Sequence, residues 1–219
     1  MNIKVMHWNI RHGQGIGGSY SLIRIAQLIL TENPDIVGLN EVYQFPLFWD
    51  QPQKLADLTG MKYVFQRNVS FGPLGSYGNA ILVKGRINSS GDIPLPKVQG
   101  FERRGLLLVS AEIGNERVYF GTTHLGLRKS DRISQISFLE SKLSKYSPLI
   151  VTGDFNGPPA ELRPLLVDHK LAGEYHTYPA NKPRKQLDYV IYSKELKLTE
   201  SKTVKSLASD HLPIISTFK

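Results

Sequence analysis

Short strand-like segments outnumber helical ones along this sequence, and that ratio limits the folds open to the chain. About ten segments show the alternating or short apolar patterns of strands, whereas three or four show helical periodicity. A doubly wound parallel sheet needs more helices than this. We therefore expect an α/β (α+β) fold with two packed sheets and helices outside. No low-complexity linker or break in composition divides the sequence, which predicts one domain over residues 1–219.

The predicted elements alternate along the chain. Residues 2–8 place Ile3 and Val5 at every second position, which is typical of a strand. Further strands are predicted at residues 35–40, 62–66, 80–83, 106–113, 118–123, 148–152, 187–192 and 211–218. Helices are predicted at residues 21–32, 53–58 and 131–145. The Gly114-Asn115 pair between two apolar runs is the strongest hairpin signal.

The sequence contains no cysteine, which excludes disulfides, thiolate zinc sites and a cysteine nucleophile. Its longest apolar stretches are too short to span a membrane. The N-terminal segment has a strand pattern with no apolar core of signal-peptide length behind it, so we expect a cytoplasmic protein. The sequence does not encode a readable oligomeric state, and a monomer is the default expectation.

The chain is basic. It carries 27 Lys and Arg against 19 Asp and Glu, a formal net charge of +8. Such a charge predicts attraction to polyanions, but it does not separate nucleic acid from anionic lipid. The same excess also occurs in ordinary globular proteins, so charge alone does not identify a partner.

Polar side chains lie at the ends of the predicted strands or in the loops beside them. Strand ends are where a rigid sheet presents side chains to a common cleft. The residues in such positions are Asn9, Glu41, His124, Asp154, Asn156, Asp188, Asp210 and His211. The sequence therefore predicts one polar site built from distant segments.

Taken singly, each of these residues also has a structural explanation. Asp154 and Asp210 are suited to capping turns. Glu41 and Asp188 are harder to explain, because a carboxylate beside a buried apolar run is costly unless it is paired or binds a metal. The structural explanations must all hold together, so the joint pattern favours a site.

Several acids in one cleft require a counter-charge. Two carboxylates about 4 Å apart repel by roughly 4 kcal/mol at an effective dielectric constant near 20. The only basic side chains beside these acids at the strand ends are Arg11 and the two histidines. A divalent cation with oxygen ligands solves the problem, and carboxylate and amide oxygens suit Mg²⁺ or Mn²⁺ rather than zinc.

The ordered motifs resemble those of the endonuclease/exonuclease/phosphatase superfamily, in particular its compact bacterial metal-dependent hydrolases. The similarity runs from Asn9 to His211, almost the full chain. The motifs that carry it are Trp8-Asn9-Ile10, Leu39-Asn40-Glu41-Val42, Tyr77-Gly78-Asn79-Ala80, Thr123-His124-Leu125, Gly153-Asp154-Phe155-Asn156, Leu187-Asp188-Tyr189 and Ser209-Asp210-His211-Leu212-Pro213. Each motif alone is weak, whereas the ordered set is specific.

The resemblance implies a four-layered α/β sandwich, with two mixed β-sheets packed face to face and helices outside, and it implies phosphoester hydrolysis. By matching position, Glu41 is expected to be the principal metal ligand, with Asn9 and Asp210 near the same ion. Apurinic endonucleases carry an acid where this chain has Arg11, which calls into question a second metal ligand at that corner. Arg11 either contacts the substrate or lies on the surface.

The same resemblance implies the catalytic residues. Asp154 and Asn156 are expected to orient or deprotonate the attacking water, although a metal-bound hydroxide is an alternative to Asp154 as base. His211 is expected to steady the phosphate, with Asp188 orienting it and His124 as a second phosphate-facing histidine. These residue types suit in-line attack at phosphorus, because negative charge builds on the non-bridging oxygens and needs a cation and hydrogen-bond donors.

Three further residues are expected to bind substrate. Asn79 matches a phosphate contact or a partner for His124. Arg103 and Arg104 either hold a phosphate together as a fork, or one lies in the cleft and the other in solvent.

The substrate is less well specified than the reaction. Nucleic acid is the first hypothesis, with DNA as the substrate of a nuclease or repair phosphodiesterase, since basic clusters occur at residues 103–104, 128–129 and 182–185, the last near Tyr178. The alternative is a lipid headgroup, inositol phosphate or other small phosphoester, because the short chain lacks room for long DNA-gripping insertions. Residues 45–49 would then form an apolar rim, unless they pack in the core. A non-catalytic binding module is disfavoured by the complete set of acids, amides and imidazoles.

Overall fold

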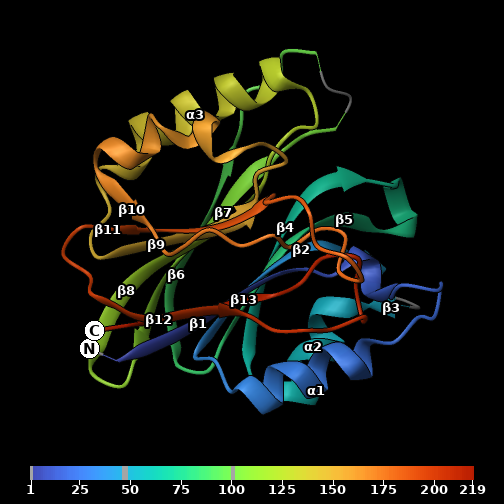
Figure 1. The fold of residues 1–219 in the computed structure, drawn as a ribbon. Helices are drawn as coiled ribbons and strands as arrows, with labels where there is room; N and C mark the ends of the chain where they lie inside the picture. Colours follow the sequence, from blue (N-terminus) through green and yellow to red (C-terminus); the bar gives the residue numbers. More distant parts are fainter. Residues whose placement is uncertain (1, 46–48, 100–101) are drawn as a thin grey trace.

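The computed structural model describes residues 2–45, 49–99 and 102–219. Figure 1 shows two β-sheets that pack face to face, with two helices on one outer side and a third helix on the other. The N- and C-termini lie together because β1 pairs with the last strand, Ile3 opposite Phe218. The expected four-layered α/β sandwich is therefore confirmed.

The first sheet has seven strands in the order β12-β13-β1-β2-β5-β4, with β3 paired to β2. Its strands are β1 (Ile3–Asn9), β2 (Ile36–Phe45), β3 (Trp49–Asp50), β4 (Lys62–Ser70), β5 (Ser76–Val83), β12 (Leu198–Thr203) and β13 (Ile214–Phe218). The β1 and β2 pair is parallel and the others are antiparallel, so the sheet is mixed.

The second sheet has six strands in the order β10-β11-β9-β8-β7-β6. They are β6 (Arg86–Pro94), β7 (Gly105–Ile113), β8 (Glu116–His124), β9 (Leu149–Asp154), β10 (His169–Leu171) and β11 (Asp188–Ser193). Here β8 and β9 are parallel, and both end in a polar residue of the predicted site. The central parallel pairs of both sheets thus deliver polar side chains to one edge of the sandwich.

Three apolar layers hold the sandwich together. The inner layer joins the sheets, with Val5 of β1 in the same cluster as Phe120 of β8. Helices α1 (Leu22–Glu32) and α2 (Gln51–Thr59) cover the outer face of the first sheet, and α3 (Lys129–Leu143) covers the second. Strand β1 is buried on both faces, because Ile3 and Val5 pack in the inner layer while Met6 and Trp8 pack under the helices.

The helix ends follow from local sequence. Ser21 accepts a hydrogen bond from the Arg24 N–H, so it caps α1 at its N-terminus. Asp50 caps α2 in the same way, and α2 ends at Gly60, whose φ of 70° is left-handed. These capping signals explain why the α1 and α2 predictions were close to the observed bounds.

Other predictions differ from the structure in instructive ways. The predicted hairpin at Gly114 is confirmed, with β7 and β8 antiparallel on either side of it. The strand predicted at residues 211–218 begins only at Ile214, because His211 lies in the preceding loop. Strand β6 was missed, since its residues are mostly exposed and polar, without an alternating apolar face.

Among the described residues, no helix combines the length and apolar character needed to cross a bilayer.

Candidate active site

A cleft of about 590 Å³ opens where strand ends from both sheets meet. Six of the eight strand-end residues line it: Glu41, His124, Asp154, Asn156, Asp210 and His211. Asn9 and Asp188 lie beneath them and are buried. The structure therefore brings together the eight strand-end residues, although they come from segments across the whole chain.

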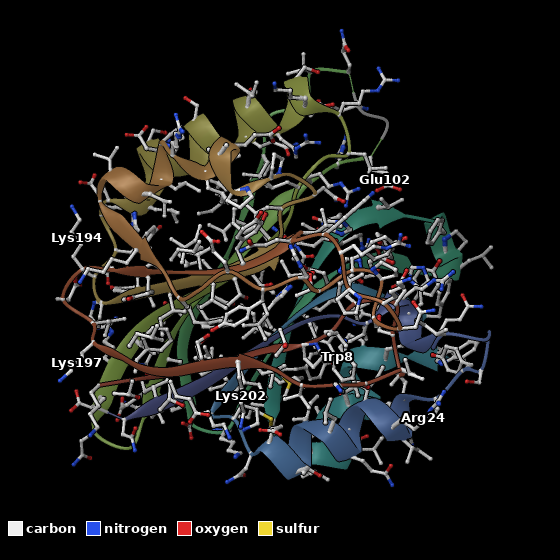
Figure 2. All side chains as sticks on the ribbon, in the orientation of Figure 1. Trp8, Arg24, Glu102, Lys194, Lys197 and Lys202 are labelled. Atoms are coloured by element: carbon white, nitrogen blue, oxygen red, sulfur yellow. The ribbon has the colours of Figure 1, made fainter. Side chains whose placement is uncertain are left out.

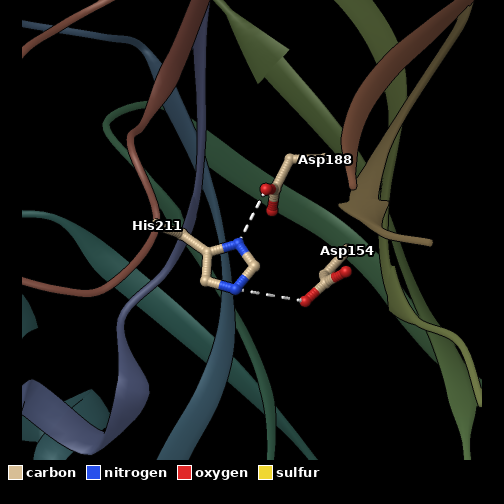
Figure 3. Close-up of side chains that lie close together, drawn as sticks. All are labelled: Asp154, Asp188 and His211. Atoms are coloured by element: carbon tan, nitrogen blue, oxygen red, sulfur yellow. Dashed lines mark hydrogen bonds and ion pairs between the residues drawn. The ribbon is translucent and has the colours of Figure 1, made fainter. Parts of the chain in front are cut away.

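Asp188 anchors a buried chain of side chains that we call the histidine–carboxylate chain: His7, Asp188 and His211. Its Oδ1 lies 2.9 Å from His7 Nε2, and its Oδ2 lies 2.7 Å from His211 Nδ1 (Figure 3). The hydroxyl of Thr177 also donates to Oδ2. All of these partners are buried, so the carboxylate is fixed in position and its lone pairs are used within the protein.

This chain sets the protonation of His211. Burial works to lower the pKa of His211, but the charge of Asp188 and their hydrogen bond raise it to about 10. Burial would conversely raise the pKa of Asp188, and the His211 charge and hydrogen bonds outweigh it, so that pKa lies well below its usual range. His211 is thus an imidazolium at neutral pH, with Nε2 facing the cleft.

Asp154 ends β9 and lies opposite Asp188 in the register of β9 and β11. Its Oδ2 accepts a hydrogen bond of 3.0 Å from Asn9 Nδ2 and lies 3.8 Å from His211 Nε2 (Figure 3). The same oxygen lies 3.6 Å from His124 Nε2. Burial, followed by the charge of Asp188, raises the pKa of Asp154 to about 6. The carboxylate is therefore ionised at neutral pH but close to the range of a general base.

His124 ends β8 and is the second imidazole against Asp154, but its charge state is the opposite of that of His211. Burial, reinforced by the charge of Arg104, lowers the pKa of His124 well below its usual value. No carboxylate accepts a hydrogen bond from it within 3.5 Å in the described residues. A neutral and a charged imidazole therefore flank one carboxylate.

Glu41 lies at a β-bulge in β2, which runs on to Phe45 instead of ending at residue 40 as predicted. Its φ of 57° is left-handed, a costly conformation that turns the side chain into the cleft. Asn9 Nδ2 donates to Glu41 Oε1 over 3.1 Å, while Asn9 Oδ1 accepts from the Arg11 N–H. Asn9 thus places its amide nitrogen between the carboxylates of Glu41 and Asp154.

We call Glu41, Asp154 and Asp210 the acidic corner. Burial raises the pKa of Glu41, and the charges of Asp154 and Asp210 add to this effect. The Arg11 guanidinium partly balances the corner, with Nε 3.7 Å from Asp210 Oδ2. The corner still holds more negative than positive charge, and all its charged ligand atoms are oxygens. This donor set fits a hard divalent cation.

Another grouping, Asp154, Asp188 and His211, brings three potential ligand atoms within 4.8 Å of one another. The hydrogen bonds of Asp188 and His211 already occupy the facing atoms, as Figure 3 shows. The acidic corner, where carboxylates are less compensated, therefore fits a cation better than this grouping does.

The three residues predicted to bind substrate lie in different surroundings. Arg104 lines the cleft and forms a 2.7 Å ion pair with Glu102, whereas Arg103 is exposed and lines an adjoining hollow. The two arginines therefore do not form a fork in one cleft. Asn79 is fully buried, and its amide bonds Asn40, Gln66 and the carbonyl of Gly105.

Of residues 45–49, the predicted apolar rim, residues 46–48 lie outside the described residues. Phe45 is partly buried and Trp49 is exposed.

Asn156 holds a left-handed φ of 51°, lines the cleft and donates to the Leu125 carbonyl.

Two important residues were missed by the sequence analysis. His7 binds Asp188, and Asn40 Oδ1 accepts the backbone N–H of Asp154, linking the two sheets directly behind the cleft. Both stand in the middle of apolar strand patterns. A polar residue in such a run is a usable signal, because burying it is costly without a partner.

Part of the positive charge lies away from the cleft. Figure 2 shows Lys194 and Lys197 at the opposite end of the view from Glu102, which lines the cleft. The net charge therefore does not by itself define the ligand.

A sequence profile of the endonuclease/exonuclease/phosphatase family matches residues 6–211. The chain belongs to this family. Its members are divalent-metal-dependent phosphoester hydrolases and include nucleases and phosphatases, so the chain is an enzyme of this class. A search of curated proteins gave no match to the sequence.

Solved structures of the family are similar over the full chain. An endonuclease/exonuclease/phosphatase from Beutenbergia cavernae has 23% identity and a TM-score of 0.85, covering 100% of this chain and 71% of that one. The catalytic domain of human Nocturnin, with a bound sulfate anion, has 25% identity and a TM-score of 0.78, covering 100% and 93%. A mannosyl-6-phosphatase from Bacteroides thetaiotaomicron has 16% identity and a TM-score of 0.81, covering 99% of both chains. At these identities the similarity supports the fold but does not select a substrate.

Proposed function

We propose that this enzyme is a phosphodiesterase that cleaves nucleic acid by in-line attack of an activated water, with Mg²⁺ or Mn²⁺ as cofactor. The observation that carries the proposal is the position of the buried Asp154 carboxylate. It lies between the neutral His124 and the charged His211 and belongs to the acidic corner. Such a carboxylate is suited to accept a proton beside a group that stabilises negative charge.

The proton and charge transfers follow from these groups. Asp154 accepts a proton from water as the water oxygen bonds to phosphorus, and the bond to the leaving oxygen breaks on the opposite side. His211 donates a hydrogen bond to a non-bridging phosphate oxygen, and Asp188 holds the imidazolium in orientation. Asn156 and Arg104 line the same cleft and are the further donors to the phosphate in this proposal.

Glu41 and Asp210, with Asn9 beside them, are the proposed cation site. A divalent cation bound at these residues supplies positive charge that offsets the charge of the phosphate in the transition state. The bulge at Glu41 holds this carboxylate in place before any cation binds.

The test is hydrolysis of bis-(p-nitrophenyl) phosphate and of an end-labelled oligodeoxynucleotide, each with Mg²⁺, with Mn²⁺ and with EDTA. We expect both to be cleaved, EDTA to abolish cleavage and either ion to restore it. Oligonucleotide binding should weaken steeply with added salt. Metal-independent turnover, or no turnover of either diester, would contradict the proposal.

A small or lipid phosphoester is the second candidate. The observation in its favour is a set of exposed apolar side chains near the cleft mouth, namely Phe71 and Leu127, with Leu74 close to Phe71 in the chain. Turnover of sphingomyelin or inositol phosphates without cleavage of any oligonucleotide would select it.

The single domain over residues 1–219, the cytoplasmic location and the monomeric state stay predictions.

A further inference from the structure

One wall of the cleft is aromatic. Tyr43 of β2, Tyr77 of β5 and Phe71, in the turn between β4 and β5, all line the cleft. We call these three residues the aromatic wall. The sequence analysis assigned them no function, and none of them is needed for the proton and charge transfers described above.

The rings of the aromatic wall pack against neighbouring rings. The His12 ring stacks on Tyr43 with a centroid separation of 4.0 Å and an angle of 3° between the rings. Tyr43 and Tyr77 meet edge to face at 5.5 Å. Phe71 stacks on Phe45, with centroids 6.1 Å apart, yet Phe71 remains 43% exposed. A phenyl ring that faces solvent at a cleft mouth offers a flat apolar surface to a ligand.

The aromatic wall lies beside the acidic corner. His12 links the two: its Nε2 lies 3.6 Å from Glu41 Oε2, and its ring stacks on Tyr43. A phosphate at the acidic corner would therefore leave the attached base beside the wall.

A second hollow of about 490 Å³ adjoins the cleft. The two share Val69 and Glu102, and the second is also lined by Arg67 and Arg103. Both arginines are exposed. Guanidinium groups in a hollow beside aromatic rings are suited to hold the phosphates that neighbour a stacked base.

Resting on the proposed function, we propose that the substrate is single-stranded nucleic acid, with one unpaired base stacked on the aromatic wall and adjacent phosphates held by Arg67 and Arg103. A duplex keeps its bases stacked inside, where they do not reach such a wall. Stacking on aromatic side chains tolerates every base, so the recognition is independent of sequence.

The test compares two labelled single-stranded oligonucleotides of equal length. One has normal bases, and the other has tetrahydrofuran abasic residues throughout its central part, which keeps the phosphates and removes the bases. We expect the wild-type enzyme to cleave the base-containing strand with a kcat/KM roughly 5- to 150-fold higher. The same sequence annealed into a blunt duplex should be cleaved more slowly than the single strand.

Variants at Phe71 test the wall itself. Phe71→Ala should reduce the ratio of base-containing to abasic cleavage, and Phe71→Trp should preserve it. Leu74→Ala is the matched control, because Leu74 is exposed in the same turn but does not line the cleft. Arg67→Ala should weaken binding of both strands and lower its salt dependence. Circular dichroism and thermal unfolding check that each variant folds.

The outcomes separate this proposal from the proposed function. Equal cleavage of the two strands by the wild-type enzyme overturns the aromatic-wall proposal while leaving a metal-dependent phosphodiesterase in place. No cleavage of any diester overturns the proposed function itself. If Phe71→Ala and Leu74→Ala instead both reduce turnover of phospholipid in anionic vesicles, and neither strand is cleaved, the wall is a lipid-contact surface and the nucleic-acid proposal is wrong.

Discussion

The two sides of the cleft solve the problem of buried charge in opposite ways. On one side, the histidine–carboxylate chain surrounds Asp188 with donors from His7, His211 and Thr177, so its charge is compensated within the protein. On the other, Glu41 lies near Asp154 and Asp210 with fewer compensating donors, and its pKa is raised by burial and by those charges. The first arrangement is complete without a ligand. The second favours the binding of a cation.

This difference separates stability from function. Substitutions in the compensated side should destabilise the metal-free protein, because they leave a buried partner unpaired. Substitutions in the acidic corner should cost activity while sparing or even improving metal-free stability. Asp154 contacts both sides, so we expect substitutions there to change both stability and activity.

The largest effect is expected at Asp154. Asp154→Asn keeps the size of the side chain and its contact with Asn9 but removes the proton acceptor, so kcat should fall by about 10²–10⁴-fold. Steady-state hydrolysis of bis-(p-nitrophenyl) phosphate measures this. Asp168→Asn, at an exposed position that does not line the cleft, is the control and should retain full activity. Near-normal turnover by Asp154→Asn would remove Asp154 from the mechanism.

The next effect is a loss of stability at Asp188. Asp188→Asn removes the buried charge that His211 and His7 face, and breaking a buried ion pair from one side typically costs about 3–5 kcal/mol. Urea unfolding of the metal-free protein in EDTA measures the free energy of unfolding. If Asp188→Asn unfolds at the wild-type urea concentration, the histidine–carboxylate chain does not contribute to stability.

Much of the fold was predictable because its signals are local. Ser21 and Asp50 cap their helices, and Gly114 turns a hairpin, all through contacts within a few residues. Strand β6 lacks such a signal, since its pairing with β7 depends on a partner strand and not on its own polar residues. Local sequence therefore predicted the helices better than the sheet edges.

The sequence predicted which residues form the site, but not which of them contact one another. Strand-end position and the ordered motifs selected Asp154 and Asp188, yet their direct opposition depends on the register of β9 and β11. That register is set by long-range packing and has no local signature. His7 and Asn40 were not predicted as site residues, because their partners lie on the other sheet, far away in sequence.

The pH dependence of stability offers a third test. His211 has a raised pKa of about 10, so its contribution should be fully present below the unfolded value near 6.5 and should be lost as pH rises through about 10. We expect the metal-free wild-type protein to lose a few kcal/mol more than His211→Gln between pH 7 and pH 10.5. Comparing urea unfolding of the two proteins cancels the titration of lysines and tyrosines. Parallel pH profiles would mean that His211 is not charged in the folded protein.

A smaller loss is expected at His7. His7→Phe fills the same space but leaves Asp188 Oδ1 without its donor, at a cost of about 1–3 kcal/mol. His7→Gln retains an N–H donor and should recover part of this loss. The exposed His176→Gln is the control, measured by the same urea unfolding. If His7→Phe also lowers kcat without changing KM, while His7→Gln restores kcat, His7 positions the Asp188–His211 pair for catalysis.

The smallest expected effect is a gain in the stability of the metal-free protein, and it discriminates best between the two sides of the cleft. At neutral pH the raised pKa of Glu41 means that ionising this carboxylate costs folding free energy, so Glu41→Gln should stabilise the metal-free protein slightly. The same substitution should reduce the stabilisation that added Mg²⁺ or Mn²⁺ gives to the wild-type protein. Thermal unfolding with and without the ion measures both changes. A Glu41→Gln variant that is less stable without metal, yet gains as much from the ion as the wild type, would place Glu41 among the structural residues and the cation elsewhere in the cleft.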